Sequence, residues 1–349
     1  MEKKCYVIGV YPPPYGGATV KCELFCHMLD KKGVQPSKVD VFEVSRKKSK
    51  ALSVFKKCIE AFRSEAPIVY CLDSKRLKAV ILLQKLFKKS FKRTTILVIG
   101  GVFHETVAED TTFEKVMKQV KGIWVETEGM REKLNQRGFR NVEVFPNPKS
   151  EQGSCVPRIA EEKRELKLVF FSQISKEKGV ESIVKLVELL DENKIIYQLD
   201  FYGHIVPQFK DEFEEFIAKS QQVKYCGVFD STKSSVYKKL NEYDILLFPT
   251  KWKGEGVPGI LVEAKMAGLA VIASPMNFNK EIIREKDKEG FLLERQYPEE
   301  MMEIIKKCSN NYDLLNQMKQ GSYQSRKRYA LEEYENMIEL LNEEEKYDS

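Results

Sequence analysis

Glu255 and Glu263 flank a glycine-rich turn, with seven residues between them, and both could accept hydrogen bonds from a polar ligand. A helix is expected over residues 258–268, at the end of this turn. The first backbone N–H groups of a helix have no partner within it, and they favour anions. A diphosphate could therefore lie against the turn without obstruction by side chains. The residues that would hold it are Gly256, Val257, Pro258 and Gly259.

Apolar runs and amphipathic stretches alternate along nearly the whole chain. Short β-branched runs are separated by segments with helical periodicity, a pattern typical of βαβ units around parallel sheets. Strands are predicted in a first series at 5–10, 38–44, 67–72, 94–100, 122–126 and 142–145. A second series is predicted at 166–172, 197–203, 223–226, 245–248, 270–274 and 290–293. We therefore expect an α/β protein with two doubly wound domains.

A segment rich in turn-forming and charged residues separates the two series. Residues 147–163 lack hydrophobic periodicity and are predicted to be the linker. We expect the first domain, with its linker, at residues 1–160 and the second at residues 161–320. Residues 321–349 are expected to form a helical tail that packs back towards the first domain.

Several common ligand classes lack their motifs in this sequence. No Gly-x-Gly-x-x-Gly turn follows Val10, and no Walker A sequence occurs, so a dinucleotide-dependent dehydrogenase is not expected. The eight cysteines include no Cys-x-x-Cys pair, and no Asp-x-Asp site follows an apolar strand, so no bound metal is expected. No known nucleic-acid-binding module accompanies the basic segments, so nucleic acid is not an expected partner.

The Glu-x7-Glu spacing, followed by Ala264, Gly268 and a strand, resembles glycosyltransferase family 4. The resemblance implies the GT-B fold, in which two Rossmann-like domains face a central cleft. It also implies that Glu255 contacts hydroxyls of the donor sugar and that Glu263 accepts hydrogen bonds from the ribose of a nucleotide diphosphate sugar. The structural alternative is a loop charge and an exposed helical glutamate.

A second part of the resemblance lies at residues 171–180. The family has Gly-Arg here, followed by Lys-Gly, and its Arg and Lys bind the donor diphosphate. Lys178 matches the family's lysine, whereas Gln173 stands in place of the arginine. A guanidinium holds phosphate oxygens bidentately and a neutral glutamine does not, so weaker donor binding is expected unless Lys251 or Lys253 compensates.

Four glycines and one histidine resemble other parts of the family's site. Gly203 and Gly227 follow predicted strands and would let a nucleotide approach the backbone closely. Gly16 and Gly17 open a helix after the first strand and match the glycine loop beneath the donor phosphates and acceptor. His104 ends a Gly-Gly-Val-Phe-His turn, which is similar to the Gly-x-Phe-His turn that places a histidine beside the reacting carbon.

The resemblance implies a retaining, metal-independent glycosyltransferase with no cofactor beyond its co-substrate, a nucleotide diphosphate sugar. His104, Glu255 and Lys178 would be its catalytic residues. The first domain would bind a glycan or lipid-linked acceptor, as in cell-surface polysaccharide biosynthesis. Two alternatives stay open: another GT-B enzyme, such as an epimerase or a phosphorylase, and a non-catalytic subunit that binds a nucleotide sugar but, because of Gln173, does not turn it over.

Basic residues are concentrated in the first part of the chain. Residues 1–100 contain 21 Lys and Arg against 8 Asp and Glu, although the net charge of the whole chain is only +6. Residues 75–93 could form a basic amphipathic helix that lies on anionic lipid, or a helix packed on its sheet with lysines in water. Its apolar stripe would comprise Leu77, Val80, Ile81, Leu83 or Phe87. Without a long apolar stretch or a leader sequence, we expect a cytoplasmic protein that can be peripheral at the inner face of the cell membrane.

Overall fold

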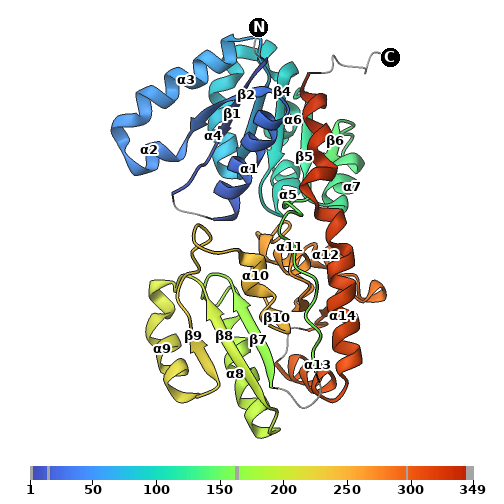
Figure 1. Ribbon diagram of the computed structural model, residues 1–349. Helices are drawn as coiled ribbons and strands as arrows, with labels where there is room; N and C mark the ends of the chain where they lie inside the picture. The colour runs from blue at the N-terminus through green and yellow to red at the C-terminus, as the bar shows by residue number, and fades with distance from the viewer. Residues whose placement is uncertain (1–2, 14–15, 162–164, 296–297, 343–349) are drawn as a thin grey trace. The chain divides into compact units, whose positions relative to one another are not determined.

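The computed structural model describes residues 3–13, 16–161, 165–295 and 298–342 (Figure 1). The chain divides into two compact units. The first comprises Met1–Asn147 and Glu332–Ser349, and the second Pro148–Leu331. The division thus falls after Asn147, at the start of the segment predicted as linker, and not at residue 160. The reason is that this segment hydrogen-bonds to the second unit, for example from the Cys155 N–H to the Met266 carbonyl at 2.8 Å.

The first unit is built on a six-stranded parallel sheet with the order β2-β1-β3-β4-β5-β6. The strands are β1 (Lys3–Gly9), β2 (Val34–Asp40), β3 (Ile68–Leu72), β4 (Thr94–Val98), β5 (Gly122–Val125) and β6 (Val142–Val144). The helices between them are α1 (Gly17–Lys31), α2 (Phe42–Arg46), α3 (Ala51–Arg63), α4 (Ser74–Gln84), α5 (Phe103–Glu109), α6 (Thr111–Met117) and α7 (Glu128–Gln136). Short 3-10 helices are η1 (Lys48–Lys50) and η2 (Lys85–Arg93).

The strand predicted at residues 38–44 is wrong in position, because β2 begins and ends four residues earlier. Asp40 ends the strand: its carboxylate accepts a hydrogen bond from the Phe42 N–H at 2.9 Å, and α2 begins there. Val41, Phe42 and Val44, which look like strand residues by type, are therefore in or beside a short helix. A local hydrogen bond from the backbone to the Asp40 side chain accompanies the turn and has here outweighed β propensity.

The second unit is a parallel sheet of the same kind, with the order β12-β11-β10-β7-β8-β9. Its strands are β7 (Leu166–Phe171), β8 (Tyr197–Tyr202), β9 (Val223–Tyr225), β10 (Ile245–Phe248), β11 (Ala270–Ala273) and β12 (Phe291–Leu292). Its α-helices are α8 (Val180–Glu192), α9 (Lys210–Lys219), α10 (Val236–Leu240), α11 (Gly259–Met266), α12 (Asn279–Ile282), α13 (Pro298–Asn310) and α14 (Tyr312–Ser325). Its 3-10 helices are η3 (Pro207–Phe209), η4 (Glu285–Asp287) and η5 (Arg326–Tyr329).

The strand orders locate the place where each sheet can hold a ligand. In the second unit the chain runs outward from β7 to β8 and β9 and then returns to the other side of β7 with β10. Loops after neighbouring strands diverge at such a switch point and leave a crevice at the carboxyl edge of the sheet. In the first unit the corresponding strands are β1 and β3.

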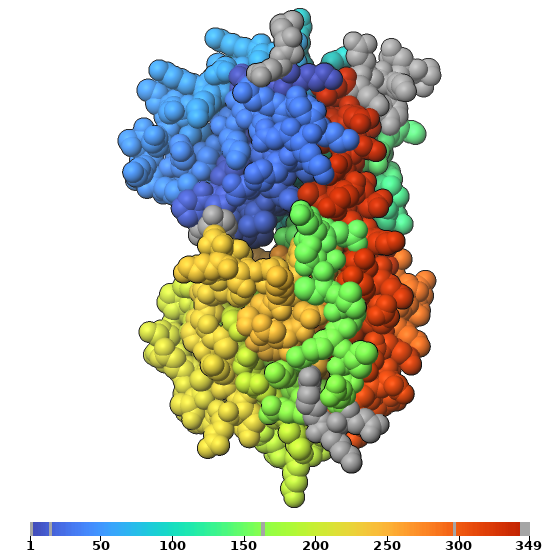
Figure 2. Space-filling model, in the orientation of Figure 1, coloured from blue at the N-terminus to red at the C-terminus, as the bar shows by residue number. Residues whose placement is uncertain are grey.

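The last 3-10 helix, η6 (Leu331–Leu341), packs on the first unit. Figure 2 shows this segment, in red, beside the blue residues of α1. Glu335 forms an ion pair with Lys31, the ring of Tyr334 lies 5.7 Å from that of Phe145, and the Leu341 carbonyl accepts a hydrogen bond from Lys121. The chain therefore returns to the unit in which it began.

Candidate active site

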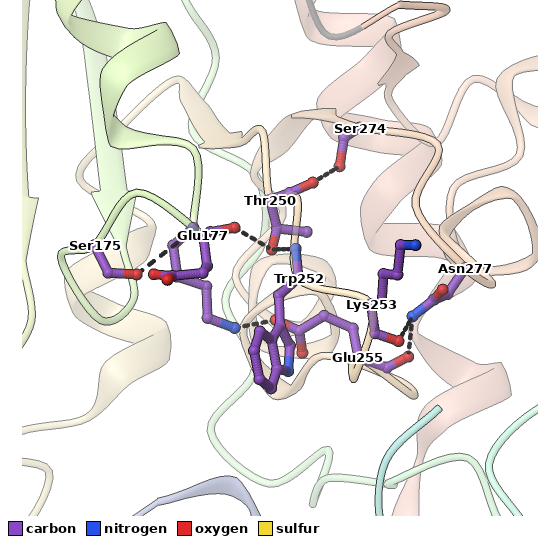
Figure 3. Close-up of polar contacts among 9 residues, drawn as sticks. Ser175, Glu177, Thr250, Trp252, Lys253, Glu255, Ser274 and Asn277 are labelled. Carbon is purple, nitrogen blue, oxygen red and sulfur yellow. Dashed lines mark hydrogen bonds and ion pairs between the residues drawn. The ribbon is translucent and has the colours of Figure 1, made fainter. Parts of the chain in front are cut away.

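The loops after β7 and β10 bring two of the predicted catalytic residues together in the second unit (Figure 3). Lys178, in the loop after β7, forms an ion pair with Glu255, in the loop after β10. Both side chains are more than four-fifths buried. An ammonium and a carboxylate held together at a topological switch point could bind the two kinds of group in a sugar phosphate, namely phosphate oxygens and hydroxyls.

Backbone and hydroxyl contacts tie the same two loops to each other. The Glu177 carbonyl accepts hydrogen bonds from the Lys251 N–H at 2.7 Å and from the Thr250 hydroxyl at 3.5 Å. The Ser274 hydroxyl, after β11, donates to the Thr250 carbonyl at 2.6 Å. Figure 3 shows this chain of contacts beside the ion pair. The loops therefore form one connected structure, which the sequence motifs alone do not indicate.

The turn that carries Glu255 is held by Asn277. The Asn277 side-chain amide donates to the Glu255 carbonyl at 2.9 Å and also to the Lys253 carbonyl (Figure 3). Asn277 has a backbone φ of 46°, a left-handed conformation that asparagine tolerates better than most residues. This residue was missed in the sequence, because a single asparagine after a strand gives no distinctive pattern.

Helix α11 begins at Gly259, as predicted within one residue, and Pro258 is its N-cap residue. The N-cap makes no side-chain hydrogen bond and the first turn carries no acidic residue. The backbone N–H groups at this start are therefore not covered by a capping carboxylate, which would repel a diphosphate. Gly256, Val257 and Pro258 are themselves buried, so the turn presents backbone more than side chain.

Glu263 lies one turn further along α11 and is paired with a lysine. Its carboxylate is 3.3 Å from the Lys149 ammonium, and both side chains are mostly buried. Lys149 is in the segment before β7 and is anchored there by a hydrogen bond from its N–H to the Tyr329 carbonyl. The Glu263 carboxylate is thus held in place, and the lysine that holds it was not predicted.

Gly179 and Gly203 are required by close backbone contacts. Gly179 has φ of 80°, and a Cβ there would lie 2.0 Å from the Pro249 carbonyl oxygen. Gly203 has φ of 147°, and a Cβ there would lie 1.8 Å from the Ser172 carbonyl oxygen. Gly227 differs: its φ is 80°, but a Cβ would meet nothing within 4 Å. The first two glycines let neighbouring loops touch, whereas Gly227 leaves open space beside the backbone.

Gln173 lies in the loop after β7 with an exposed side chain. Lys251 and Lys253, the two lysines expected to compensate for the missing arginine, are also exposed. Of the three lysines, Lys178 is the one that forms the mostly buried ion pair with Glu255. The cationic side chains that could supplement Lys178 therefore lie on the solvent side of the loops.

The predicted site residues Gly16 and Gly17 lie in the first unit, at the start of α1. Gly16 is extended, with φ of −166°, and its N–H donates to the Thr19 hydroxyl at 3.0 Å. A cavity of about 220 Å³ lies beside them. Its lining comprises Val10, Gly16, Gly17, Ala18, Thr19, Phe42 and Arg76. Residues 14 and 15, which precede the glycines in the motif, lie outside the described residues.

His104 is the second residue of α5 in the first unit and is buried. The ammonium of Lys133, on α7, lies 3.0 Å from its Nε2, and the Glu105 carboxylate lies 3.8 Å from the same atom. Burial lowers the pKa of His104, the positive charge of Lys133 lowers it further, and Glu105 opposes both. The lowered pKa favours the neutral imidazole.

The structure thus brings Lys178, Glu255, the start of α11 and Glu263 into one unit, with Gly203 and Gly227 at neighbouring strand ends. The remaining predicted residues, His104, Gly16 and Gly17, belong to the other unit. Among the described residues no cluster of His, Cys, Asp and Glu side chains could hold a metal ion. In the same residues, no helix is long and apolar enough to cross a membrane.

The family model for glycosyl transferases group 1 matches residues 156–325. This range contains Lys178, Glu255 and Glu263 together with both loops that hold them. The match covers most of the second unit. The match supports the motif-based recognition of a glycosyltransferase, and the connected loops described above lie within the matched residues.

Curated relatives match this chain only in part. An uncharacterized glycosyltransferase of Methanocaldococcus jannaschii is 29% identical over 153 residues, which cover 43% of this chain and 38% of the relative. An uncharacterized protein in the cps region of Klebsiella pneumoniae is 26% identical over 144 residues, which cover 41% of this chain and 37% of the relative. The match therefore spans less than two fifths of the length of these relatives.

The likeness of fold extends over nearly the whole chain. Anabaena HepE, solved in complex with UDP, is 12% identical and covers 97% of this chain and 98% of its own, with a TM-score of 0.74. HepE has also been solved in complex with UDP-glucose. With two six-stranded parallel sheets flanked by helices, this likeness confirms the predicted GT-B fold of two Rossmann-like units.

Proposed function

We propose that this protein is a retaining glycosyltransferase of family 4 that takes a sugar from a nucleotide diphosphate donor bound in its second unit. The Lys178–Glu255 ion pair carries the proposal, because it places a cation and a hydrogen-bond acceptor at the carboxyl edge of the sheet. The group 1 match and an uncovered start of α11 in the same unit support it. The complexes of HepE make UDP the first nucleotide to test.

The donor diphosphate would bind between the start of α11 and Lys178. Departure of the nucleoside diphosphate leaves negative charge on its oxygens, and N–H groups with a mostly buried ammonium stabilise that charge without reorganising. Glu255 would accept hydrogen bonds from the sugar hydroxyls, and Glu263, oriented by Lys149, from the ribose. Because these groups supply the positive charge that the leaving group needs, we propose a reaction that requires no metal ion or cofactor.

The first unit would present the acceptor and His104. A positive charge develops at the anomeric carbon of a glycosyl group as the leaving group departs, so a neutral imidazole is the better neighbour. The lowered pKa of His104 supports this role. Gly16 and Gly17, beside the cavity at the start of α1, would let phosphates or the acceptor approach the backbone.

The acceptor that we propose is a glycan or a lipid-linked sugar in cell-surface polysaccharide biosynthesis. The relative in the Klebsiella pneumoniae cps region supports this setting. The basic first part of the chain supports an anionic acceptor or membrane surface. We propose that the protein works in the cytoplasm and binds peripherally to the inner face of the cell membrane.

Turnover of a donor tests the proposal. The purified protein would be incubated with UDP-, GDP- and ADP-sugars in the presence of EDTA, and the released nucleoside diphosphate would be measured. One donor should be consumed, and Glu255→Ala should slow its consumption by about a hundredfold or more. Glu214→Ala, at an exposed position of α9, is the matched control and should leave the rate unchanged. Equal rates for both variants would contradict the proposal.

A non-catalytic binding subunit is the second candidate, and the exposed, neutral Gln173 favours it. Such a subunit would bind a nucleotide sugar through Lys178 and Glu263 but release no nucleoside diphosphate. Gln173→Arg distinguishes the two functions. If the unchanged protein turns over the donor and Gln173→Arg binds it somewhat more tightly, the enzyme is supported. If both proteins bind the donor tightly and neither turns it over, the protein is the binding subunit.

A further inference from the structure

Helices α3 and α4 both contact the first sheet, and η2 contacts both helices, so the three form one connected layer (Figure 1). The ring of Phe62 on α3 lies 5.7 Å from that of Phe87 in η2. Leu77 and Ile81 on α4 are fully buried, and Phe87 is half-buried. The apolar stripe predicted for residues 75–93 therefore faces the sheet and is not the surface that could meet lipid.

A different set of apolar side chains faces solvent from the same layer. Leu82, on α4, and Leu86, at the start of η2, are 65% and 77% exposed, in contrast to the buried Leu77 and Ile81. On α3, Leu52 is 64% and Phe55 48% exposed. Large apolar side chains exposed to this degree, in one helical layer, are typical of a surface that binds another apolar phase.

The segments that carry the exposed apolar residues are rich in cations. Residues 48–63 and 74–93 carry thirteen Lys and Arg and a single acidic residue, Glu60. Glu60 itself is bound by Lys4 and Tyr6. The basic residues are Lys48, Lys50, Lys56, Lys57, Arg63, Lys75, Arg76, Lys78, Lys85, Lys88, Lys89, Lys92 and Arg93. We call this surface, together with Leu52, Phe55, Leu82 and Leu86, the basic face.

We propose that the basic face docks on an anionic lipid bilayer, with Leu82 and Leu86 inserting below the headgroups. Lysines and arginines attract anionic lipid by about fivefold in affinity for each charge near the surface, and long aliphatic stems let the charges stay at the headgroups. Exposed leucines between them enter the acyl region. The inference rests on the proposed function only in that a lipid-linked acceptor would lie at the same surface.

A bilayer explains the basic face better than nucleic acid does. Phosphate backbones would use the cations but give no reason for two exposed leucines. Lipid uses both, because electrostatic attraction and apolar burial add in interfacial binding. Part of the charge is already engaged, since Arg76 pairs with Asp73 and Lys78 with Asp110, so the remaining lysines would supply most of the attraction.

Vesicle sedimentation with the full chain tests the inference. The protein would be mixed with vesicles of phosphatidylcholine alone, or with phosphatidylglycerol in equal parts, without any donor. We expect binding to the anionic vesicles only, with affinity falling as salt is raised. The double variant Leu82→Ser/Leu86→Ser should lose about tenfold or more in affinity, because both apolar anchors are gone. Lys88→Glu/Lys89→Glu should lose a comparable amount.

The matched control is Ile159→Ser/Ile196→Ser, two residues of the second unit that are 72% and 71% exposed. This variant should bind vesicles as the unchanged protein does, and far-ultraviolet circular dichroism of all variants should be alike. Equal binding to neutral vesicles, or equal loss in the control, would overturn the inference. So would preferential binding of a DNA duplex. Because this assay contains no donor, a failure to bind vesicles would not contradict the proposed turnover of a nucleotide sugar. A failure of turnover would likewise not contradict vesicle binding.

Discussion

The ammonium of Lys178 and the carboxylate of Glu255 form an ion pair that joins the loops after β7 and β10, although 76 residues separate them in the sequence. In the function that we propose, Lys178 binds the donor diphosphate and Glu255 binds the donor sugar. A donor that contacts both must therefore exchange part of this pairing for its own contacts. The pair also keeps two mostly buried charges compensated.

Removing the charge of Lys178 or Glu255 alone should lower the unfolding free energy by more than half as much as removing both charges together. Lys178→Met leaves the Glu255 carboxylate mostly buried without its cation, and Glu255→Gln leaves the ammonium in the same position. The double variant removes both charges. We expect a coupling free energy of about 1–3 kcal/mol in urea unfolding of the four proteins. Additive losses would mean that the two side chains do not interact in solution.

Two glycines of the site should tolerate alanine very differently. Gly203→Ala places a Cβ 1.8 Å from the Ser172 carbonyl oxygen, so we expect a loss of about 3 kcal/mol or more in unfolding free energy. Gly227→Ala has open space at its Cβ and should cost about 1–2 kcal/mol, from its left-handed backbone alone. Thermal and urea unfolding of both variants measure the contrast. Similar losses would contradict the loop contacts described here.

The protonation of His104 can be measured directly, because the chain has only three histidines. Lys133 lowers the pKa of His104 and Glu105 raises it. Lys133→Met should therefore raise the pKa of this imidazole, and Glu105→Gln should lower it further. Proton NMR titration of the histidine ring signals gives both shifts, and Lys133→Arg should stay close to the unchanged protein.

The pH profile of turnover should follow the same titration. If a neutral His104 is needed, activity falls as pH drops through its pKa, because the imidazole gains a proton and a charge. Lys133→Met should then move the acidic limb of the profile to higher pH. An unmoved acidic limb, with the NMR titration shifted, would show that His104 does not act in the reaction.

Glu289, Lys265 of α11 and Arg328 form an ionic cluster. The unfolding free energy should depend most on its one anion, Glu289. Glu289 binds the Lys265 ammonium at 2.9 Å and the Arg328 guanidinium at 2.6 and 2.7 Å. Burial lowers the pKa of Lys265 to about 8, against the opposing effect of Glu289. Glu289→Gln leaves the buried Lys265 and the partly buried Arg328 without their anion and should cost about 3 kcal/mol in unfolding free energy.

Lys265→Met is the comparison for this cluster. It leaves Glu289 still paired with Arg328 and replaces a buried charge by an apolar side chain of similar length, so the cost should be about 1 kcal/mol or less. Urea unfolding of both variants shows which substitution lowers the unfolding free energy more. A larger loss in Lys265→Met than in Glu289→Gln would reverse the account of this cluster.

The sheets were predictable because each strand is a short buried run between amphipathic segments. Ile245–Phe248 and Ala270–Ala273, for instance, are fully apolar and lie in the sheet essentially as predicted. The strand at residues 34–40 was misplaced because Pro36 and Ser37 are unlike strand residues. They are accommodated at the edge of the sheet, where polar side chains and a proline are tolerated.

The candidate site was predictable only where it rests on local motifs. Glu255, Lys178 and the start of α11 follow strand ends that can be recognised in the sequence. Their partners cannot, because Lys149 reaches Glu263 from more than 100 residues away and Lys133 reaches His104 from another helix. Such contacts depend on packing across elements, which periodicity does not encode. The exposure of Leu82 and Leu86 was missed because the sequence does not indicate which side of residues 75–93 faces the sheet.

Nucleotide binding tests the central claim most directly. The melting temperature of the protein would be recorded with UDP, GDP and ADP at millimolar concentration, for the unchanged chain, Glu263→Ala and the exposed control Glu214→Ala. We predict that one nucleotide raises it by several degrees, less so in Glu263→Ala and equally in the control, because a ligand that binds only the folded state stabilises that state. No shift with any nucleotide, or the same shift in all three proteins, would contradict a donor site at α11.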